Sequence, residues 1–285
     1  MIKIGFIGAG NMGGALALAA SKTDCQLYVT DVDADKAAAL CVRTGATQTD
    51  NNTVCAACDL IFLGVKPQML ATVAAELSPM LQSRTTPYCL VSMCAGVTLA
   101  RLGELFPDAP VIRIMPNTPV AVGQGMILYC YNALTTKEQT DAFLYAMAHA
   151  GKLELLDEDL FDAGTSVSGC GPAFAYLFAD ALAKGGEDCG LSYEQATALA
   201  SQMLLGAALM LQEDGRSPDA LREAEMLWDH LTAKEKASLT TFQVGLVNVQ
   251  LVEKHGHDGP FAYAEDADGV IDADVYEVAK DFLAL

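Results

Sequence analysis

The chain has 285 residues, of which 52% are hydrophobic and 19% charged. This composition predicts a large buried core, and the length suits two domains. Acidic residues outnumber basic residues by 36 to 17, so the formal net charge is −19. That charge repels phosphate backbones and anionic lipids, which excludes nucleic acid and membrane surfaces as expected partners. The nine cysteines are an odd number at irregular spacing, which favours free thiols in a reducing compartment such as the cytoplasm.

The N-terminal segment allows a second interpretation, because Lys3 followed by an apolar stretch resembles a secretory signal. Several glycines and Asn11 interrupt that stretch, whereas the apolar part of a signal is continuous, and the number of thiols argues against export. No segment approaches the ~18 uninterrupted apolar residues of a membrane-spanning helix. The sequence therefore predicts a soluble protein of the cytoplasm.

Short β-branched runs alternate with helical stretches through the first half of the chain. Runs that are apolar on both faces predict strands at residues 2–7, 26–30, 59–65, 88–93 and 111–114. The stretches between them predict helices at residues 11–21 and 34–43, in a short segment before residue 59, and from residue 68 onward. Buried strands separated by helices imply a parallel sheet covered on both faces. The predicted fold class is α/β, with a Rossmann-like doubly wound parallel sheet.

The pattern becomes helical after about residue 156. Pro172 suits the first turn of a helix. Residues 172–183 and 193–211 are apolar around most of the helical circumference, so these helices must be buried on nearly all sides. A small helical domain cannot supply that cover alone. We therefore expect a homodimer or a higher homo-oligomer.

The run Gly8-Ala9-Gly10-Asn11-Met12-Gly13 follows the first strand and opens the first helix. In this strand–loop–helix context, Gly8 allows a tight turn and Gly10 allows the backbone to approach a pyrophosphate. Gly13 allows close packing of helix and strand. The N-terminus of the helix offers free N–H groups and a partial positive charge to the phosphates. The alternative is a glycine-rich corner kept only for packing; dinucleotide binding explains the spacing better.

Asp31 ends the second strand, where a carboxylate can accept hydrogen bonds from an adenosine ribose and repel a 2′-phosphate. Asp33 and Asp35 add to that repulsion, and Lys36 is the only cation nearby. We therefore expect NAD(H) to be favoured over NADP(H). The alternative role of an N-cap for the following helix suits Asp33 better than Asp31.

Several further motifs follow in order, and together they make the chain resemble the pyrroline-5-carboxylate reductases, which reduce a cyclic imine to proline. The resemblance extends from residue 2 to about residue 211. It rests on IGFIGAGNMGGAL, FLGVKPQ, VSMCAGVT, RIMPNTPVAVGQG, SGCGPAFAYLFADAL and GLSYEQATALASQMLLGAALML. It implies a Rossmann-like N-terminal domain, a helical C-terminal domain that dimerises, and an active site between them.

The resemblance also implies which residues bind the cofactor. They are expected in loops after the carboxyl ends of the predicted strands, where doubly wound sheets bind ligands. Pro116 and Pro119 would stiffen the loop that carries Asn117, and Lys66 is alternatively a surface lysine. The full set is Gly8, Gly10, Asn11, Met12, Gly13, Asp31, Val65, Lys66, Pro67, Ala95, Gly96 and Asn117.

The substrate side departs from the family pattern. The expected substrate-binding residues are Ser168, Cys170, Gly171 and Thr232, of which Ser168 and Thr232 are the catalytic candidates. The family motif SGSGPAY reads SGCGPAF here, so two hydroxyl groups are lost. The later motif SPGGTT, which holds the substrate carboxylate in the family, reads LWDHLT at residues 227–232. Only Thr232 matches the threonine credited with protonating the imine, and Asp229 would repel an anion.

The expected function is NAD(P)H-dependent reduction of a cyclic imine, 1-pyrroline-5-carboxylate, to proline, as in proline biosynthesis. The hydride would come from the nicotinamide and the proton from Thr232, Ser168 or a bound water. Two alternatives stay open. The first alternative is a non-catalytic dimer that binds a dinucleotide. The second is a reductase of a different, uncharged cyclic imine.

The expected domains are therefore a dinucleotide-binding Rossmann-like domain at residues 1–156, an all-helical dimerisation and substrate domain at 157–255, and an acidic C-terminal extension at 256–285 that includes a short helix from Asp274. No metal site is expected. Cys55 and Cys58 have redox-motif spacing, but two thiols packed on a short helix beside a buried strand are the favoured interpretation. The histidines are scattered, and His230 beside Asp229 is expected to be structural or solvated.

Overall fold

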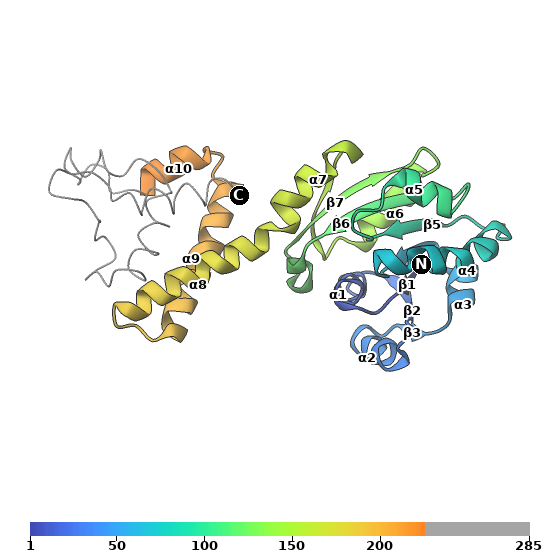
Figure 1. Ribbon diagram of the computed structural model, residues 1–285, viewed down its shortest axis with the longest axis horizontal. Helices are drawn as coiled ribbons and strands as arrows, with labels where there is room; N and C mark the ends of the chain where they lie inside the picture. The colour runs from blue at the N-terminus through green and yellow to red at the C-terminus, as the bar shows by residue number, and fades with distance from the viewer. Residues whose placement is uncertain (226–285) are drawn as a thin grey trace. The chain divides into compact units, whose positions relative to one another are not determined.

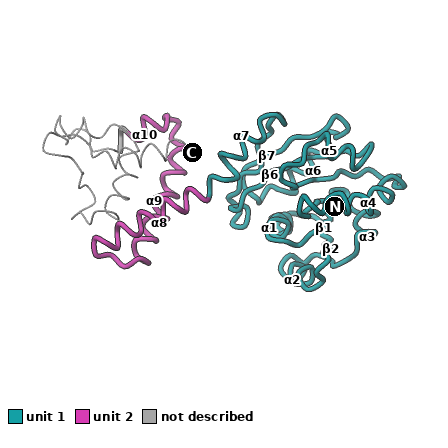
Figure 2. The backbone as a smooth tube through the Cα atoms, viewed as in Figure 1, with its two compact units in different colours: residues 1–172 teal, residues 173–285 magenta. Residues whose placement is uncertain are grey.

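The computed structural model describes residues 1–225 (Figure 1). The chain divides into two compact units, residues 1–172 and 173–285 (Figure 2). The sequence pattern places the domain boundary at residue 156, where the alternation of strands and helices ends. The division in the structure comes later, after residue 172, so residues 157–172 belong to the first unit. The acidic extension at 256–285, with the helix expected from Asp274, lies outside the described residues.

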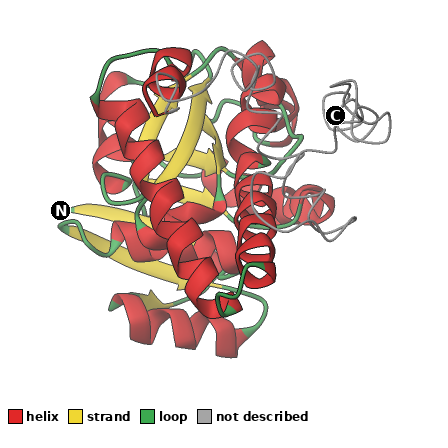
Figure 3. Ribbon diagram, turned by 90° about the vertical axis from the view of Figure 1, so that its left-hand side faces the viewer, coloured by secondary structure: helices red, strands yellow, loops and turns green. Residues whose placement is uncertain are grey.

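The strands of the first unit form one eight-stranded sheet in the order β3-β2-β1-β4-β5-β6-β7-β8, drawn in yellow in Figure 3. The order 3-2-1-4-5-6 is that of a doubly wound Rossmann sheet. Every predicted strand is present. The bounds are β1 (Ile2–Ile7), β2 (Cys25–Thr30), β3 (Thr47–Gln48), β4 (Leu60–Leu63), β5 (Cys89–Ser92), β6 (Val111–Pro116), β7 (Gly125–Tyr131) and β8 (Gly151–Leu155).

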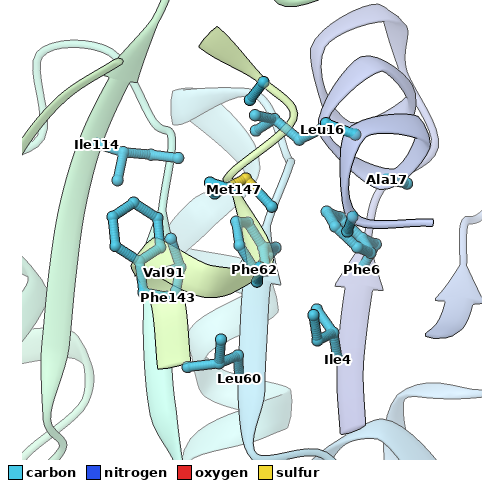
Figure 4. Close-up of a cluster of buried hydrophobic side chains, with 14 of the residues drawn as sticks. Ile4, Phe6, Leu16, Ala17, Leu60, Phe62, Val91, Ile114, Phe143 and Met147 are labelled. Atoms are coloured by element: carbon cyan, nitrogen blue, oxygen red, sulfur yellow. The ribbon is translucent and has the colours of Figure 1, made fainter. Parts of the chain in front are cut away.

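Helices cover both faces of the sheet. Alternate side chains of each buried strand belong to two separate hydrophobic clusters, because successive side chains of a strand point to opposite faces. Phe6 stacks on Phe62 at 4.6 Å between ring centroids, and Phe143 lies 6.4 Å from Phe62 on the same face (Figure 4). Ile61 and Leu63 lie in the other cluster. The doubly wound architecture predicted from the sequence is confirmed.

The helices of the first unit divide between these two clusters. One face packs against α1 (Asn11–Ala20), α2 (Ala34–Thr44) and α6 (Lys137–Ala146). The other packs against α3 (Asn51–Ala57), α4 (Leu70–Gln82) and α5 (Leu99–Leu105).

The sequence pattern predicts a parallel sheet, but one pair of neighbouring strands is antiparallel. β7 runs antiparallel to β6, and β8 runs parallel to β7. Residues 117–124 alone separate β6 from β7, which is too short for the crossover of a dozen or more residues that a parallel pair needs. A 3₁₀ turn, η2 (Thr118–Val122), therefore returns the chain beside β6 in the opposite direction.

A chain of short helical turns follows β8. It comprises η3 (Glu158–Leu160), α7 (Phe161–Gly164) and the π-helix η4 (Thr165–Gly169), and leads directly into α8 (Gly171–Asp188). Phe161 is buried with Leu128 and Cys130 of β7. That contact holds the start of this segment on the sheet.

The described part of the second unit consists of the rest of α8, α9 (Tyr193–Glu213) and α10 (Pro218–Glu225). The two long helices predicted from the sequence are confirmed. Small residues meet where α8 and α9 pack: Ala183 and Ala196 are buried, and a Cβ on Gly186 would crowd Ala196. Many large apolar side chains of both helices are exposed, namely Phe174, Tyr176, Leu177, Leu199, Met203, Leu205, Leu209, Met210 and Leu211.

Among the described residues, no helix combines the length and the hydropathy that crossing a membrane requires.

Candidate cofactor and substrate site

The predicted cofactor loops share one edge of the sheet. β2, β1, β4, β5 and β6 are mutually parallel neighbours, so their carboxyl ends lie side by side. β1 and β4 are adjacent, yet α1 after β1 and α4 after β4 cover opposite faces. This is the switch point at which doubly wound sheets open a crevice for ligands.

The glycine loop brings backbone groups into contact that side chains would separate. Gly8 has a φ of +110° and donates its N–H to the carbonyl of Thr30 at 2.8 Å. A Cβ on Gly8 would collide with the carbonyl oxygen of Gly64, and a Cβ on Gly13 would collide with that of Gly8. The turn and the close helix–strand packing expected of these two glycines are therefore present in the geometry.

Gly10 is different, because the space beside it is open. It is the N-cap of α1, no side chain caps this end, and no heavy atom lies within 4 Å of the position of its missing Cβ. The first turn of α1 contains no acidic residue. The first N–H groups of a helix have no intrahelical acceptor and carry a partial positive charge. The loop thus has the form of an anion site, which fits the phosphates of a dinucleotide.

Asp31 is part of the same loop structure. Its Oδ2 accepts the N–H of Ala9 at 2.6 Å, and its Oδ1 accepts the N–H of Asp33 at 2.8 Å. Asp33, not Asp31, is the N-cap of α2, as the sequence favoured. Lys36 forms an ion pair with Asp33 at 3.2 Å and donates its N–H to the same carboxylate. The Lys36 side-chain hydrogen bond, followed by the backbone one, holds the pKa of Asp33 below its usual value.

The loops after β4 and β5 are joined by a buried thiol. Cys94 donates its S–H to the carbonyl of Val65 at 3.4 Å, and burial raises its pKa, so the thiol is a neutral donor. Lys66 and Pro67 are exposed on one side of this contact, and Ala95 and Gly96 on the other. This contact links the loop that follows β4 to the loop that follows β5.

Asn117 is brought together with Ser168, although the two were assigned to the cofactor and substrate sides. Nδ2 of Asn117 donates to the carbonyl of Ser168 at 2.9 Å, and its Oδ1 accepts the N–H of Met126 at 2.9 Å. Ser168 Oγ donates to the carbonyl of Gly164 at 2.9 Å. Cys170 is exposed and immediately precedes α8, which begins at Gly171.

The remaining substrate candidate is Thr232. Thr232 and the whole altered segment 227–232 lie outside the described residues, as do His230 and Asp229.

One ion pair beside the site has no counterpart in the sequence-based expectations. Arg113 of β6 contacts Glu158 of η3 at 2.7 Å, and the same carboxylate oxygen accepts the N–H of Leu99 at the start of α5 at 2.6 Å. The Arg113 guanidinium also lies over the ring of Phe161, 4.6 Å from its centroid. A single arginine in an otherwise apolar strand was the available signal; its partner, distant in sequence, gave none.

Cys55 and Cys58 are buried structural thiols, as favoured from the sequence. Burial raises their pKa values to about 11 and about 12, which disfavours the reactive thiolate. Arg84 donates to the backbone carbonyls of both cysteines at 2.7 Å and so satisfies the end of α3. Among the described residues, no group of three or more His, Cys, Asp and Glu side chains is arranged to hold a metal.

Two family descriptions match the chain. "Pyrroline-5-carboxylate reductase dimerisation" matches residues 158–229, and "NADP oxidoreductase coenzyme F420-dependent" matches residues 3–96. A pyrroline-5-carboxylate reductase of Pisum sativum is 35% identical over 224 residues, which cover 77% of this chain and 81% of the relative. The corresponding protein of Escherichia coli is 36% identical over 227 residues, covering 78% and 83%.

Solved structures agree with this. A pyrroline-5-carboxylate reductase from Coxiella burnetii has a TM-score of 0.71 at 30% identity and covers 78% of this chain and 83% of its own. The pyrroline carboxylate reductase of Plasmodium falciparum, solved with NADP bound, has a TM-score of 0.72 at 28% identity and covers 89% and 98%. By sequence identity and by the coverage of both chains, this chain belongs to the pyrroline-5-carboxylate reductase family.

Proposed function

We propose that the chain is an NAD(P)H-dependent reductase that converts 1-pyrroline-5-carboxylate to proline. The observation that carries the proposal is the open, uncapped N-terminus of α1 at Gly10, in a chain whose relatives are named for that reaction. An anion site at the switch point of a doubly wound sheet is where a dinucleotide pyrophosphate binds. The Plasmodium falciparum relative, which was solved with NADP bound, further supports a nicotinamide cofactor.

Different segments of the first unit would bind different parts of the cofactor. Residues 8–13 would hold the phosphates, Asp31 the adenosine ribose, and the loops that carry Lys66 and Ala95 the nicotinamide end. The bound cofactor supplies a hydride to the imine carbon, and the ring nitrogen takes a proton. The hydroxyl proton of Ser168 is engaged by Gly164, which favours Thr232 or a bound water as the proton donor. The Ser168 oxygen can still accept a hydrogen bond from the protonated ring nitrogen.

The substrate carboxylate has fewer candidate hydrogen-bond donors in this chain than the family motif provides. Without the family's glycine loop, its candidate donors are Ser168, the N–H groups at the start of α8 near Gly171, and Thr232. Losing two or three charge-assisted hydrogen bonds, at ~1.5–3 kcal/mol each, is expected to raise the KM for 1-pyrroline-5-carboxylate by at least about a hundredfold compared with a relative that has the intact loop. An uncharged cyclic imine should be reduced relatively better.

Steady-state kinetics with 1-pyrroline-5-carboxylate and with 1-pyrroline test this expectation. Turnover of both compounds, with a high KM for the first, supports the proposal. A KM as low as that of an intact-loop enzyme would show that the role given to residues 227–232 is wrong. Tight NADH binding with turnover of neither compound would favour the second candidate, a non-catalytic dinucleotide-binding dimer.

The proposed cofactor preference is NADH over NADPH. A 2′-phosphate would meet the Asp31 carboxylate, and the nearby Lys36 ammonium is already paired with Asp33. Asp31→Asn removes the charge and keeps one acceptor. At an effective dielectric constant of about 20, the repulsion between this carboxylate and a neighbouring phosphate is at least ~1–2 kcal/mol. The ratio of NADPH to NADH dissociation constants should therefore fall by at least about tenfold.

Fluorescence titration with both cofactors measures that ratio. Asp24→Asn is the matched control, because Asp24 is exposed at the amino end of the same strand, away from the loop. The control should leave the ratio unchanged. A wild-type protein that prefers NADPH would contradict the role given to Asp31.

The proposed assembly is a homodimer or a higher homo-oligomer formed through the second unit. Phe174, Tyr176 and Leu199 are each more than half exposed within the described chain, and such apolar side chains require cover. The matched dimerisation description overlaps α8 and α9. Because the stability of an obligate dimer depends on protomer concentration, dilution should lower the melting temperature. A monomer by light scattering at low micromolar concentration, with a melting temperature that dilution does not change, would contradict the assignment.

The proposed compartment is the cytoplasm. All nine cysteines are free thiols in the structure, and a reducing compartment keeps them so.

A further inference from the structure

The backbone carbonyl of Ser168 lacks its regular helical partner. In an α-helix each carbonyl accepts the N–H of the residue four positions later, and four positions after Ser168 the chain has Pro172. Proline has no N–H to donate. The helix is also irregular here, because the N–H of Cys170 bonds to the carbonyl of Thr165 in the i→i+5 pattern of a π-helix. Ser168 is partly buried, so leaving its carbonyl without a donor would be unfavourable.

Asn117 supplies the missing donor. Its Nδ2 lies 2.9 Å from the Ser168 carbonyl oxygen, while its Oδ1 accepts the N–H of Met126 at the start of β7. The side chain is buried, with Asn117 9% exposed. An acceptor on one side and a donor on the other allow only one orientation of the amide. Both ends of the amide are thus committed to the backbone.

We propose that Asn117 is a positioning residue that replaces the N–H absent at Pro172 and thereby holds the segment from Ser168 to Gly171 in register with the carboxyl end of β6. On this account the amide acts on the substrate side through Ser168, and it does not bind the cofactor directly. The kinetic consequence rests on the proposed reductase function; the structural consequence does not. Misplacing a substrate-binding segment by a fraction of an ångström raises KM and lowers kcat without altering a cofactor site elsewhere.

Asn117→Asp tests the donor specifically. The substitution keeps an oxygen facing the Met126 N–H and places a second oxygen against the Ser168 carbonyl, so the donor is lost and a negative charge is added. Asn132→Asp is the matched control at the other end of β6. There Nδ2 of Asn132 donates to the carbonyl of Ala109 at 2.8 Å, and Oδ1 accepts the N–H of Val111 at 3.1 Å. Both variants lose one amide donor to a backbone carbonyl and gain the same negative charge, so the control accounts for the change of charge.

Two readouts separate positioning from stability. Amide hydrogen exchange of the peptide spanning residues 164–171 should accelerate in Asn117→Asp and not in Asn132→Asp, and this holds whether or not the protein turns over an imine. In kinetic assays, Asn117→Asp should raise the KM for 1-pyrroline-5-carboxylate about tenfold, with the NADH dissociation constant within about twofold of wild type. Exchange that is equal in the two variants would overturn the proposal.

The role of Pro172 is tested by giving the helix back its N–H. In the Pro172→Ala background, residue 172 can donate to Ser168 itself, so Asn117→Asp should accelerate exchange much less and raise KM only slightly. If the effects of Asn117→Asp and Pro172→Ala are strictly additive, Asn117 does not compensate for the N–H that Pro172 lacks. Loss of NADH affinity in Asn117→Asp equal to the change in KM would instead assign Asn117 to the cofactor. If exchange accelerates in Asn117→Asp but the wild-type protein turns over no imine, the positioning role of Asn117 is supported and the reductase function is contradicted.

Discussion

Gly10→Val is expected to weaken NADH binding about a thousandfold and to leave the fold intact. The backbone of Gly10, at φ −66° and ψ −179°, is an extended conformation that any residue adopts, and open space surrounds the position of the added Cβ. The valine side chain would occupy the approach to the N–H groups of α1, where the pyrophosphate is proposed to bind. Excluding it should remove several kcal/mol of binding energy, a loss of about a thousandfold in affinity.

Isothermal titration with NADH measures the loss, and thermal unfolding checks the fold. Replacing an N-cap glycine should cost about 1 kcal/mol of stability at most. Gly103→Val in α5 is the matched control, because Gly103 also has open space at its Cβ position and lies away from the glycine loop. If a folded Gly10→Val protein binds NADH as tightly as the control, the proposed cofactor site is wrong.

Glu158→Leu is expected to destabilise the first unit by about 3–5 kcal/mol, because it leaves a buried arginine without its counter-charge. The side chain of Arg113 is 9% exposed and that of Glu158 30%, so the cation is the more deeply buried partner. The substitution also removes the acceptor for the N–H of Leu99. Urea unfolding followed by circular dichroism measures the change in the free energy of unfolding.

The exposed pair Arg101–Glu104 provides the comparison for this prediction. Its atoms approach to 2.6 Å, but its side chains are 54% and 65% exposed, and exposed pairs contribute ~0–1 kcal/mol. Glu104→Leu should therefore have little effect. Equal destabilisation by Glu158→Leu and Glu104→Leu would show that burial does not determine the strength of the Arg113 pair.

The parts of the fold that could be predicted are those specified by neighbouring residues. The glycine loop between β1 and α1, the acidic end of β2 and the two long helices α8 and α9 are each visible in short windows of sequence. β7 and β8 were missed because their pairing is set by the short return at Thr118–Val122 and by contacts distant in the chain. α5 was missed because it is short and contains Gly103.

The candidate site divides in the same way. The positions of Gly8, Gly10 and Asp31 follow from their spacing relative to strands. The resemblance indicated that Asn117 belongs to the site, but its contact with Ser168 depends on two segments that meet only in the folded chain. The missing N–H of Pro172 was visible in the sequence, and the residue that compensates for it was not.

The proposed reaction transfers a hydride from NADH to the imine carbon of 1-pyrroline-5-carboxylate. The most direct measurement is turnover with NADH carrying deuterium at the transferred position, followed by mass spectrometry of the product. We expect proline with deuterium on the former imine carbon, and far less labelled proline from the Gly10→Val variant at the same NADH concentration. Unlabelled product, or no proline from a wild-type protein that is folded and saturated with NADH, would contradict it.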